Sequence, residues 1–221
     1  MKDGDYEMVL ENTDKYVVEF YNHSRKDFED VFNIEANYFS EETIADVDQV
    51  ISWDRKNSDI HIFVRDKNVN KVIGEITLLP LTDNQFIKFM NNELSDTELN
   101  AESLENYTNN YSYNLLFSAI AVDKDYRNDK LVLSCLLKGL YEKISILIGR
   151  GIRIKNMCAE GQTKDGQKFA ENFLNLKEQN TTKEGYKLYS FDSEEDFNKW
   201  FNLFPTYIKK YDVSINANKI L

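Results

Sequence analysis

The chain has 221 residues and a formal net charge of −11, with 42% hydrophobic and 13% aromatic residues. This length and composition predict one compact domain and exclude a disordered chain. The acidic balance disfavours a nucleic-acid partner, which requires a basic face, and the absence of a long apolar run disfavours a membrane span.

The cysteine and histidine content predicts a reduced protein without a metal site. Cys135 and Cys158 lie within apolar runs and are interpreted as buried free thiols. His23 and His61 lack the spacing of metal ligands. The first residues are acidic with no apolar stretch behind them, so we expect no secretory signal and a cytoplasmic location.

The N-terminal half is expected to mix strands and helices. In chain order we predict a strand over 16–21, helices over 27–37 and 42–56, strands over 60–65 and 71–79, and a short helix over 84–92. Pro80 is expected to end the strand before it, because proline cannot donate to the ladder. Residues 93–110 are polar and aperiodic, which is typical of a functional or mobile loop.

The most informative stretch runs from Leu115 to Leu147. It predicts a buried strand over 115–122, a charged turn over 123–130 and a long apolar helix from Leu131. The first N–H groups of such a helix, with the positive end of its dipole, favour an anion such as a phosphate. The pattern therefore indicates a ligand that carries a pyrophosphate.

The C-terminal third is predicted to return to the same sheet. Gly149 and Gly151 suit the end of the long helix, and a strand over 152–159 and a helix from Thr163 to about Asn175 follow. The last expected elements are strands over 177–178 and 186–191 and a helix that begins after Ser193. Since a helix crosses over between 115–122 and 152–159, those two strands are expected to be parallel. The fold class is therefore an α/β (α+β) sandwich, with residues 1–192 as one domain and 193–221 as a helical extension packed on it.

This order of elements resembles the GNAT superfamily of N-acetyltransferases over about residues 16–191. The hairpin over 60–79 is similar to the family's second and third strands, and residues 119–127 are similar to its fourth strand and cofactor loop. Residues 159–176 are similar to the fifth strand and the helix after it. The resemblance implies a mixed, mostly antiparallel sheet with a central parallel pair and helices on both faces.

By this resemblance, acetyl-CoA lies where the fourth and fifth strands separate, and its pyrophosphate meets the turn after the fourth strand. The implied cofactor-binding residues are Ile120, Ala121, Val122, Arg127, Asn128, Lys130, Leu131, Val132, Thr163 and Gly166. Lys130 and Val132 stand where the family has small residues that permit close approach to the phosphates. Asp129 is a natural N-cap, so its carboxylate would compete with phosphate for the same amides.

Arg127 and Lys130 offer a compensation, because both can make charge-assisted contacts to phosphate. For Arg127 the alternative is a surface salt bridge with Asp123 or Asp125. We weigh these two readings of Arg127 evenly.

Acetyl transfer to an amine needs a base for the amine and hydrogen-bond donors for the thioester and its leaving group. Glu75 and Glu160 are candidate bases, and Ser118 is the third candidate catalytic residue. Tyr113 and Tyr126 are further candidate donors. The alternative for each is an ordinary solvated acid or a hydroxyl satisfied in the core. The family's usual tyrosine acid has no counterpart, since its position falls near Ala170 or Glu171.

The leading hypothesis is a cytoplasmic acyl-CoA-dependent N-acyltransferase that acts by direct transfer in a ternary complex. It would use acetyl-CoA and acylate a primary amine on a small molecule or peptide, with the acidic segment 93–105 recruiting the acceptor. Tyr107, Tyr111 and Tyr113 either line the acceptor pocket or simply pack together. A homodimer stays open alongside a monomer.

Two alternatives remain open. One is a GNAT fold without catalysis that serves as a binding module, in which Lys130 and Val132 fill or narrow the cofactor groove. The other is an unrelated α/β nucleotide binder, which is weaker because the chain has neither a P-loop nor a GxGxxG pattern.

Overall fold

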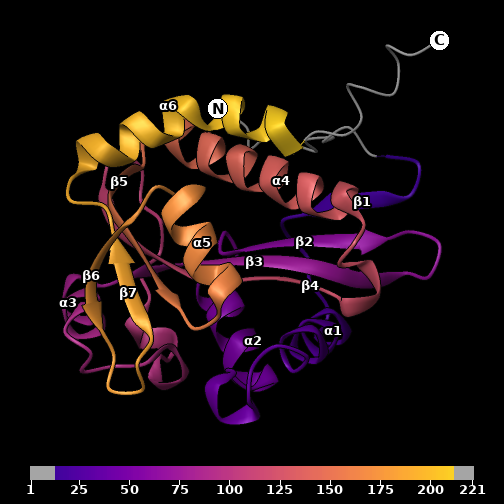
Figure 1. Ribbon diagram of the computed structural model, residues 1–221, viewed down its shortest axis with the longest axis horizontal. Helices are drawn as coiled ribbons and strands as arrows, with labels where there is room; N and C mark the ends of the chain where they lie inside the picture. Colours follow the sequence, from indigo (N-terminus) through magenta and orange to yellow (C-terminus); the bar gives the residue numbers. More distant parts are fainter. Residues whose placement is uncertain (1–12, 212–221) are drawn as a thin grey trace.

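The computed structural model describes residues 13–211, which form one seven-stranded sheet with helices on both faces (Figure 1). The strands are β1 (Tyr16–Glu19), β2 (His61–Asp66), β3 (Lys71–Leu81), β4 (Ser112–Val122), β5 (Arg153–Gly161), β6 (Lys177–Thr181) and β7 (Lys187–Ser190). The α-helices are α1 (Arg25–Glu35), α2 (Val47–Lys56), α3 (Asp83–Met90), α4 (Lys130–Gly149), α5 (Lys164–Asn172) and α6 (Glu194–Tyr211). The acidic start of the chain, on which the expectation of no secretory signal rests, and residues 212–221 of the expected extension lie outside the described residues.

The strand order is β1-β2-β3-β4-β5-β7-β6. Only β4 and β5 pair in parallel, and every other neighbouring pair in the described sheet is antiparallel. A parallel pair needs a long crossover, and α4 supplies it. The mixed sheet with a central parallel pair is thus confirmed.

Two layers of helices bury the two faces of the sheet. In Figure 1, α4, α5 and α6 lie over one face, and α1 and α2 lie over the other. Leu136, Leu140 and Ile144 of α4 are fully buried because three- and four-residue spacing places them on the stripe that meets the sheet. Trp200 and Phe204 of α6 are also buried, so the aromatic residues of this helix belong to the core rather than to an open binding surface.

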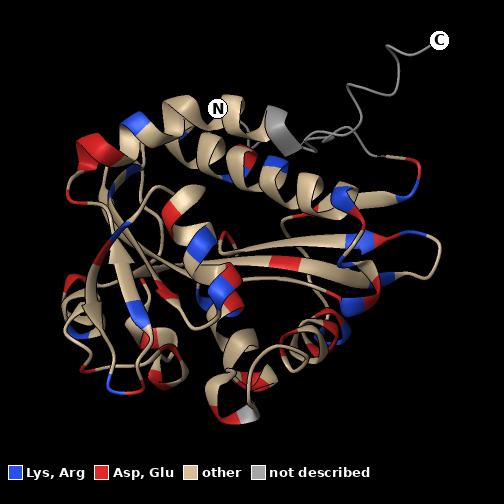
Figure 2. Cartoon of the chain, in the orientation of Figure 1, with Lys and Arg blue, Asp and Glu red and all other residues tan. Residues whose placement is uncertain are grey.

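Charged residues of both signs are spread over the protein. In the view of Figure 2, acidic and basic residues are interleaved along the helices and loops. Both cysteines are buried, as the sequence predicts. None of the helices within residues 13–211 combines the length and apolarity that crossing a bilayer requires.

The structure corrects two predicted elements. Pro80 does not end its strand: β3 continues to Leu81, and the Pro80 carbonyl accepts a hydrogen bond from the Glu105 backbone N–H at 2.8 Å. The predicted helix over 42–56 is split, because the Asp46 side chain accepts from Gln49 N at 2.8 Å and starts a separate helix at Val47.

The segment over 93–110, which follows α3, is irregular, as expected, but parts of it adopt regular turns. It contains two short 3₁₀ turns, Asp96–Glu98 and Ala101–Ser103, which are capped by Ser95 and Asn100. These caps hold one side of the segment against the sheet, where Leu99 and Leu104 are buried.

Candidate functional site

The site begins where β4 and β5 separate. Their parallel pairing runs from Ser112 opposite Arg153 to Phe117 opposite Ala159, although both strands continue beyond this point. Ser118 is an extra residue on β4, because the neighbouring β3 residues pair with Phe117 and Ala119. Such a bulge bends the strand and re-aims a side chain, so the bulge and the parting of the strands coincide.

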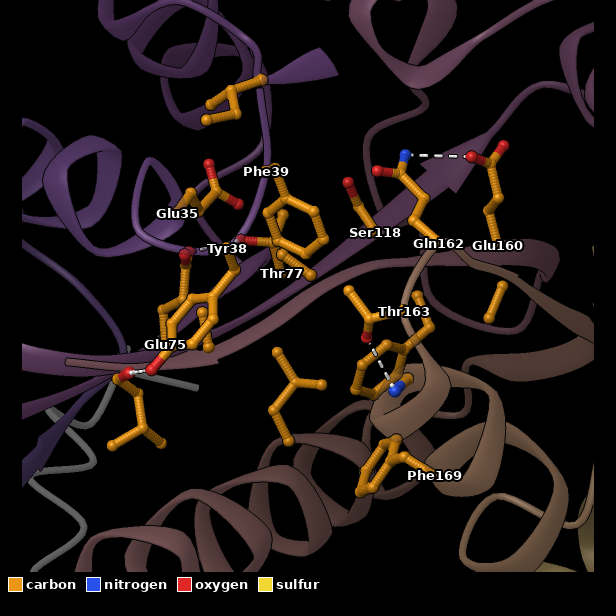
Figure 3. Close-up of a pocket in the computed structure, with 18 of the residues that line it drawn as sticks. Glu35, Tyr38, Phe39, Glu75, Thr77, Ser118, Glu160, Gln162, Thr163 and Phe169 are labelled. Carbon is orange, nitrogen blue, oxygen red and sulfur yellow. Dashed lines mark hydrogen bonds between the residues drawn. The ribbon is translucent and has the colours of Figure 1, made fainter. Parts of the chain in front are cut away.

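A cavity of about 540 Å³ occupies this gap and reaches both faces of the sheet. Val31, Glu35 and Trp53 line it on the α1–α2 side, whereas Leu133, Phe169 and Leu174 line it on the α4–α5 side. The volume lies within the range of small-ligand sites. Figure 3 shows one group of labelled side chains around Glu35 and Glu75 and a second group around Ser118 and Glu160.

Two carboxyl groups form one wall of the cavity. Glu75 is 1% exposed; its Oε2 accepts from the Thr77 hydroxyl at 3.5 Å, and its Oε1 has no hydrogen-bond partner among the described residues. Burial raises the pKa of Glu75 well above the ordinary value, and the neighbouring Glu35 carboxyl raises it further. Burial, with the charge of Asp96, raises the pKa of Glu35 to about 7. The pair therefore holds a proton near neutral pH.

Two further acids line the same cavity. Burial raises the pKa of Asp96 to about 6. Burial and the charge of Asp96 raise the pKa of Glu160 to about 7, although the Gln162 amide donates to Glu160 Oε1 at 2.9 Å and opposes this rise. A cavity with four poised carboxyl groups can accept a proton or hold a cation.

The N-terminus of α4 is capped by its own acid. Asp129 Oδ1 accepts from Leu131 N at 3.0 Å, and Oδ2 accepts from the Tyr16 hydroxyl at 2.6 Å. Lys15 lies 3.5 Å from the same Oδ2. The Asp129 carboxylate therefore occupies one backbone amide at the start of α4. By the resemblance to the GNAT superfamily, this helix start would bind the pyrophosphate, and the sequence analysis expected Asp129 to compete for it.

Arg127 lies at the edge of the cavity and is exposed. Its guanidinium donates to Asp165 Oδ2 of α5 at 2.8 Å and lies 5.5 Å from the centre of the Tyr38 ring. The predicted alternative of a salt bridge with Asp123 or Asp125 names the wrong partner, since Asp123 pairs with Lys71 at 2.6 Å. Arg127 instead ties the turn after β4 to α5.

The cavity gathers most of the residues predicted from the sequence. Glu75, Ser118, Glu160, Ile120, Ala121, Val122, Arg127, Thr163 and Gly166 all line it. Asn128, Lys130, Leu131 and Val132 are not among the lining residues. Val132 is fully buried against Gly74 in the core, so it does not narrow the groove as the binding-module alternative expects.

The tyrosines that were considered as donors make other contacts. The Tyr113 hydroxyl accepts from Thr108 N and donates to Asn106 O, and the Tyr126 hydroxyl donates to Asp66. Tyr107 and Tyr111 pack edge-on against Tyr113. None of these four tyrosines lines the cavity.

Several lining residues were missed by the sequence analysis. They are Glu35, Tyr38, Phe39, Thr77 and Gln162, whereas Asp96, which also lines the cavity, belongs to the acidic segment 93–105 that was expected to recruit the acceptor. Tyr38 donates its hydroxyl to Val122 O at 2.6 Å and so fixes the loop after α1 against the end of β4. Within residues 13–211, no group of three or more His, Cys, Asp or Glu side chains is arranged to hold a metal ion.

Comparison with known proteins places the fold. No family model and no curated protein matches the chain. Its fold is similar to that of a chain in the crystal structure of the NatC complex bound to Gag peptide and CoA, with a TM-score of 0.52, 9% identity and coverage of 80% of this chain and 96% of that chain. It is also similar to the loading GNATL domain of CurA from Lyngbya majuscula, with a TM-score of 0.51, 10% identity and coverage of 81% and 98%. The chain therefore has the GNAT fold.

Proposed function

We propose that the chain is an acyl-CoA-dependent N-acyltransferase that acylates a primary amine by direct transfer. The observation that carries this proposal is the cavity in the gap where β4 and β5 part, lined by Ser118 on one strand and Glu160 on the other. Its location in a GNAT fold supports a CoA thioester as the acyl donor. We further propose a cytoplasmic protein whose acceptor is a small molecule or a peptide.

The pantetheine part of acetyl-CoA fits the β4 edge. From Ser118 to Val122, β4 pairs with β3 on one side and has left β5 on the other. Backbone N–H and C=O groups on that free edge can pair with an extended ligand that carries amides, as an added strand would. Ser118, Ala119 and Ile120 are the residues placed to do so.

The diphosphate part fits less well. Asp129 puts a carboxylate at the helix start, and Asp123 Oδ1 accepts from Asp125 N at 3.0 Å in the preceding turn. Arg127 is the lining residue that can compensate this negative charge. To do so, its guanidinium must leave the ion pair with Asp165 and bind a phosphate. We therefore expect a donor affinity that depends strongly on Arg127.

The acids supply the chemistry that an amine acceptor requires. When bound, the thioester would supply a C–S bond that breaks as the amide C–N bond forms, and the thiol would leave with the second proton that the attacking nitrogen gives up. The amine must first lose a proton, and a buried carboxylate with a raised pKa is suited to take it. Glu75, with its open Oε1 and its neighbour Glu35, is our proposed base. The lining acids also favour entry of a cationic acceptor.

Calorimetry with acetyl-CoA tests the proposal. We expect measurable binding to the wild-type protein and about 10- to 100-fold weaker binding to Arg127→Glu, because a hydrogen bond to a charged group contributes about 1.5–3 kcal/mol. Arg153→Glu, at the exposed start of β5, is the matched control and should bind as the wild type does. No heat at millimolar acetyl-CoA would overturn the proposal. Unchanged affinity of Arg127→Glu would remove only this side chain from the site.

The second candidate function is a binding module without catalysis. The capping of α4 by Asp129 is the observation that favours it. Release of free thiol from acetyl-CoA in the presence of a panel of alkyl and peptide amines separates the two. Binding of acetyl-CoA without thiol release from any amine would favour the module.

A further inference from the structure

A line of polar side chains leaves the cavity at Glu75 and runs between the sheet and α1. Glu75 and Thr77 are two residues apart on β3 and so share a face, and His61 is the register partner of Thr77 on β2. Thr77 Oγ1 lies 3.5 Å from Glu75 Oε2 and 3.0 Å from His61 Nδ1. The antiparallel register thus connects a cavity acid to a histidine that is fully buried.

The line continues through a second histidine. The His61 and His23 rings lie 5.8 Å apart, and Nε2 of each ring is buried without a hydrogen-bond partner among the described residues. His23 Nδ1 lies 3.4 Å from Asp54 Oδ1 on α2. The His23 side chain is 1% exposed and that of Asp54 is 20% exposed, so the line ends at solvent.

We propose that Thr77, His61 and His23 form a proton relay from Glu75 to Asp54. The inference rests on the proposed function, because the proton is the one that Glu75 takes from the acceptor amine. Two orphaned ring nitrogens in adjacent buried rings are a setting that suits an internal water, and the proposed relay requires one such water between the two histidines.

Each group between Glu75 and solvent gains one proton and releases one, so that over the whole sequence Glu75 loses a proton and solvent gains it. Glu75 gives its proton to Thr77 Oγ1, and the Thr77 hydroxyl proton passes to His61 Nδ1. His61 releases the proton of its Nε2 to the water, which passes one to His23 Nε2. His23 releases its Nδ1 proton to Asp54, and Asp54 releases it to solvent. At the end each ring carries its proton on the other nitrogen.

The surroundings keep His61 neutral, as this exchange requires. Burial lowers the pKa of His61 well below its ordinary value, and the charge of Lys143 lowers it further. A ring that is protonated on both nitrogens has no lone pair to receive a proton. Phe28 and Phe63 pack against both histidines, with ring centres between 4.3 and 5.8 Å away, and close this path to bulk water.

Through the relay, the proton can leave Glu75 for solvent without passing through the mouth of the cavity. An acceptor amine and an acyl donor together fill the gap between β4 and β5, and water cannot then reach Glu75 from that side. A path under α1 stays open while both ligands are bound. Thr77, His61 and His23 therefore act as positioning residues for Glu75 and need not touch the ligands.

Nitrogen NMR of the histidine rings in the ligand-free protein tests the relay without any acyl donor. In the wild type, the His61 ring signals are expected to shift as Glu35, whose burial raises its pKa to about 7, titrates beside Glu75. Thr77→Val keeps the shape but removes the hydroxyl, so this coupled shift is lost, whereas Thr77→Ser retains it. The same His61 titration in all three proteins would overturn the relay.

A second variant tests the end of the relay that reaches solvent, at the partly exposed Asp54. Asp54→Asn is expected to change the ring signals of both His23 and His61, whereas Asp48→Asn, on the exposed side of the same helix, leaves them unchanged. A change confined to His23 would break the proposed link between the rings. If acetyl-CoA fails to bind while the coupled shifts are present, the proposed function falls and the hydrogen-bonded line stands.

Discussion

Replacing Glu160 by glutamine should show how much a buried carboxylate in the cavity lowers the free energy of unfolding. The pKa of Glu160 rises from the ordinary 4.5 to about 7 in the folded protein. At about 1.4 kcal/mol per pH unit, this rise corresponds to about 3 kcal/mol. Because the folded state holds the proton more tightly, this stability is fully present below pH 4.5 and is lost as the pH rises from 4.5 to 7.

Glutamine keeps the size of the side chain and removes the charge. We therefore expect Glu160→Gln to change the free energy of unfolding by less than about 0.5 kcal/mol at pH 4.5, and to raise it by about 2–3 kcal/mol at pH 8. Urea denaturation at the two pH values measures both quantities. Glu102→Gln, at a side chain that is 87% exposed, is the control and should show no such difference. Equal effects of Glu160→Gln at both pH values would refute the reasoning.

Three further changes test other parts of the structure. Asp129→Ser keeps a cap on α4 but removes its charge, so acetyl-CoA should bind about 3- to 10-fold more tightly by calorimetry, and unchanged affinity would place the phosphates elsewhere. Gly139→Ala would place a Cβ 2.8 Å from Ile62 Cγ2, and this overpacking outweighs the gain in helix propensity. It should lower the free energy of unfolding by about 1 kcal/mol, and a higher melting temperature would contradict this. Trp200→Phe removes the indole donor to Phe173 O at 2.8 Å and leaves a void, which should cost about 2–4 kcal/mol in urea unfolding.

The fold follows from patterns that are local in the sequence. The apolar residues of α4 recur every three or four positions over 20 residues, and the strands on either side of it are apolar, so a parallel crossover is hard to avoid. The exceptions have local causes as well. Pro80 lacks an N–H, but its carbonyl still pairs with Glu105, and the strand therefore survives it.

The site was only partly predictable because its wall comes from distant elements. Glu160 could be named because it lies next to the end of a recognisable strand, and Ser118 because it is a hydroxyl within an otherwise apolar one. Glu35 is the last residue of a helix with a polar face, and its sequence context is that of a surface acid. Only the packing of α1 against β3 brings it beside Glu75. No pattern in 93–110 indicates that Asp96 reaches the same cavity.

The relay depends on register, which the sequence specifies only in part. A hairpin over 60–79 can be read from the sequence, but a bulge between Val64 and Arg65 sets which residues face each other. A shift by one residue would move His61 away from Thr77 to the opposite face of the sheet. The pairing of these two side chains is therefore a result of the three-dimensional structure.

The charges of the cavity assign its two ends to different ligands. Glu35, Glu75, Asp96 and Glu160 repel an anion, so the phosphates of an acyl donor are expected at the edge where Arg127 lies. There Asp129 already accepts a hydrogen bond from a backbone N–H at the start of α4, and its negative charge reduces the attraction of the helix dipole for a phosphate. The free edge of β4 carries no such competing charge. In the proposed complex, backbone pairing with the pantetheine arm therefore holds the donor more than the diphosphate does, and the acids face the amine.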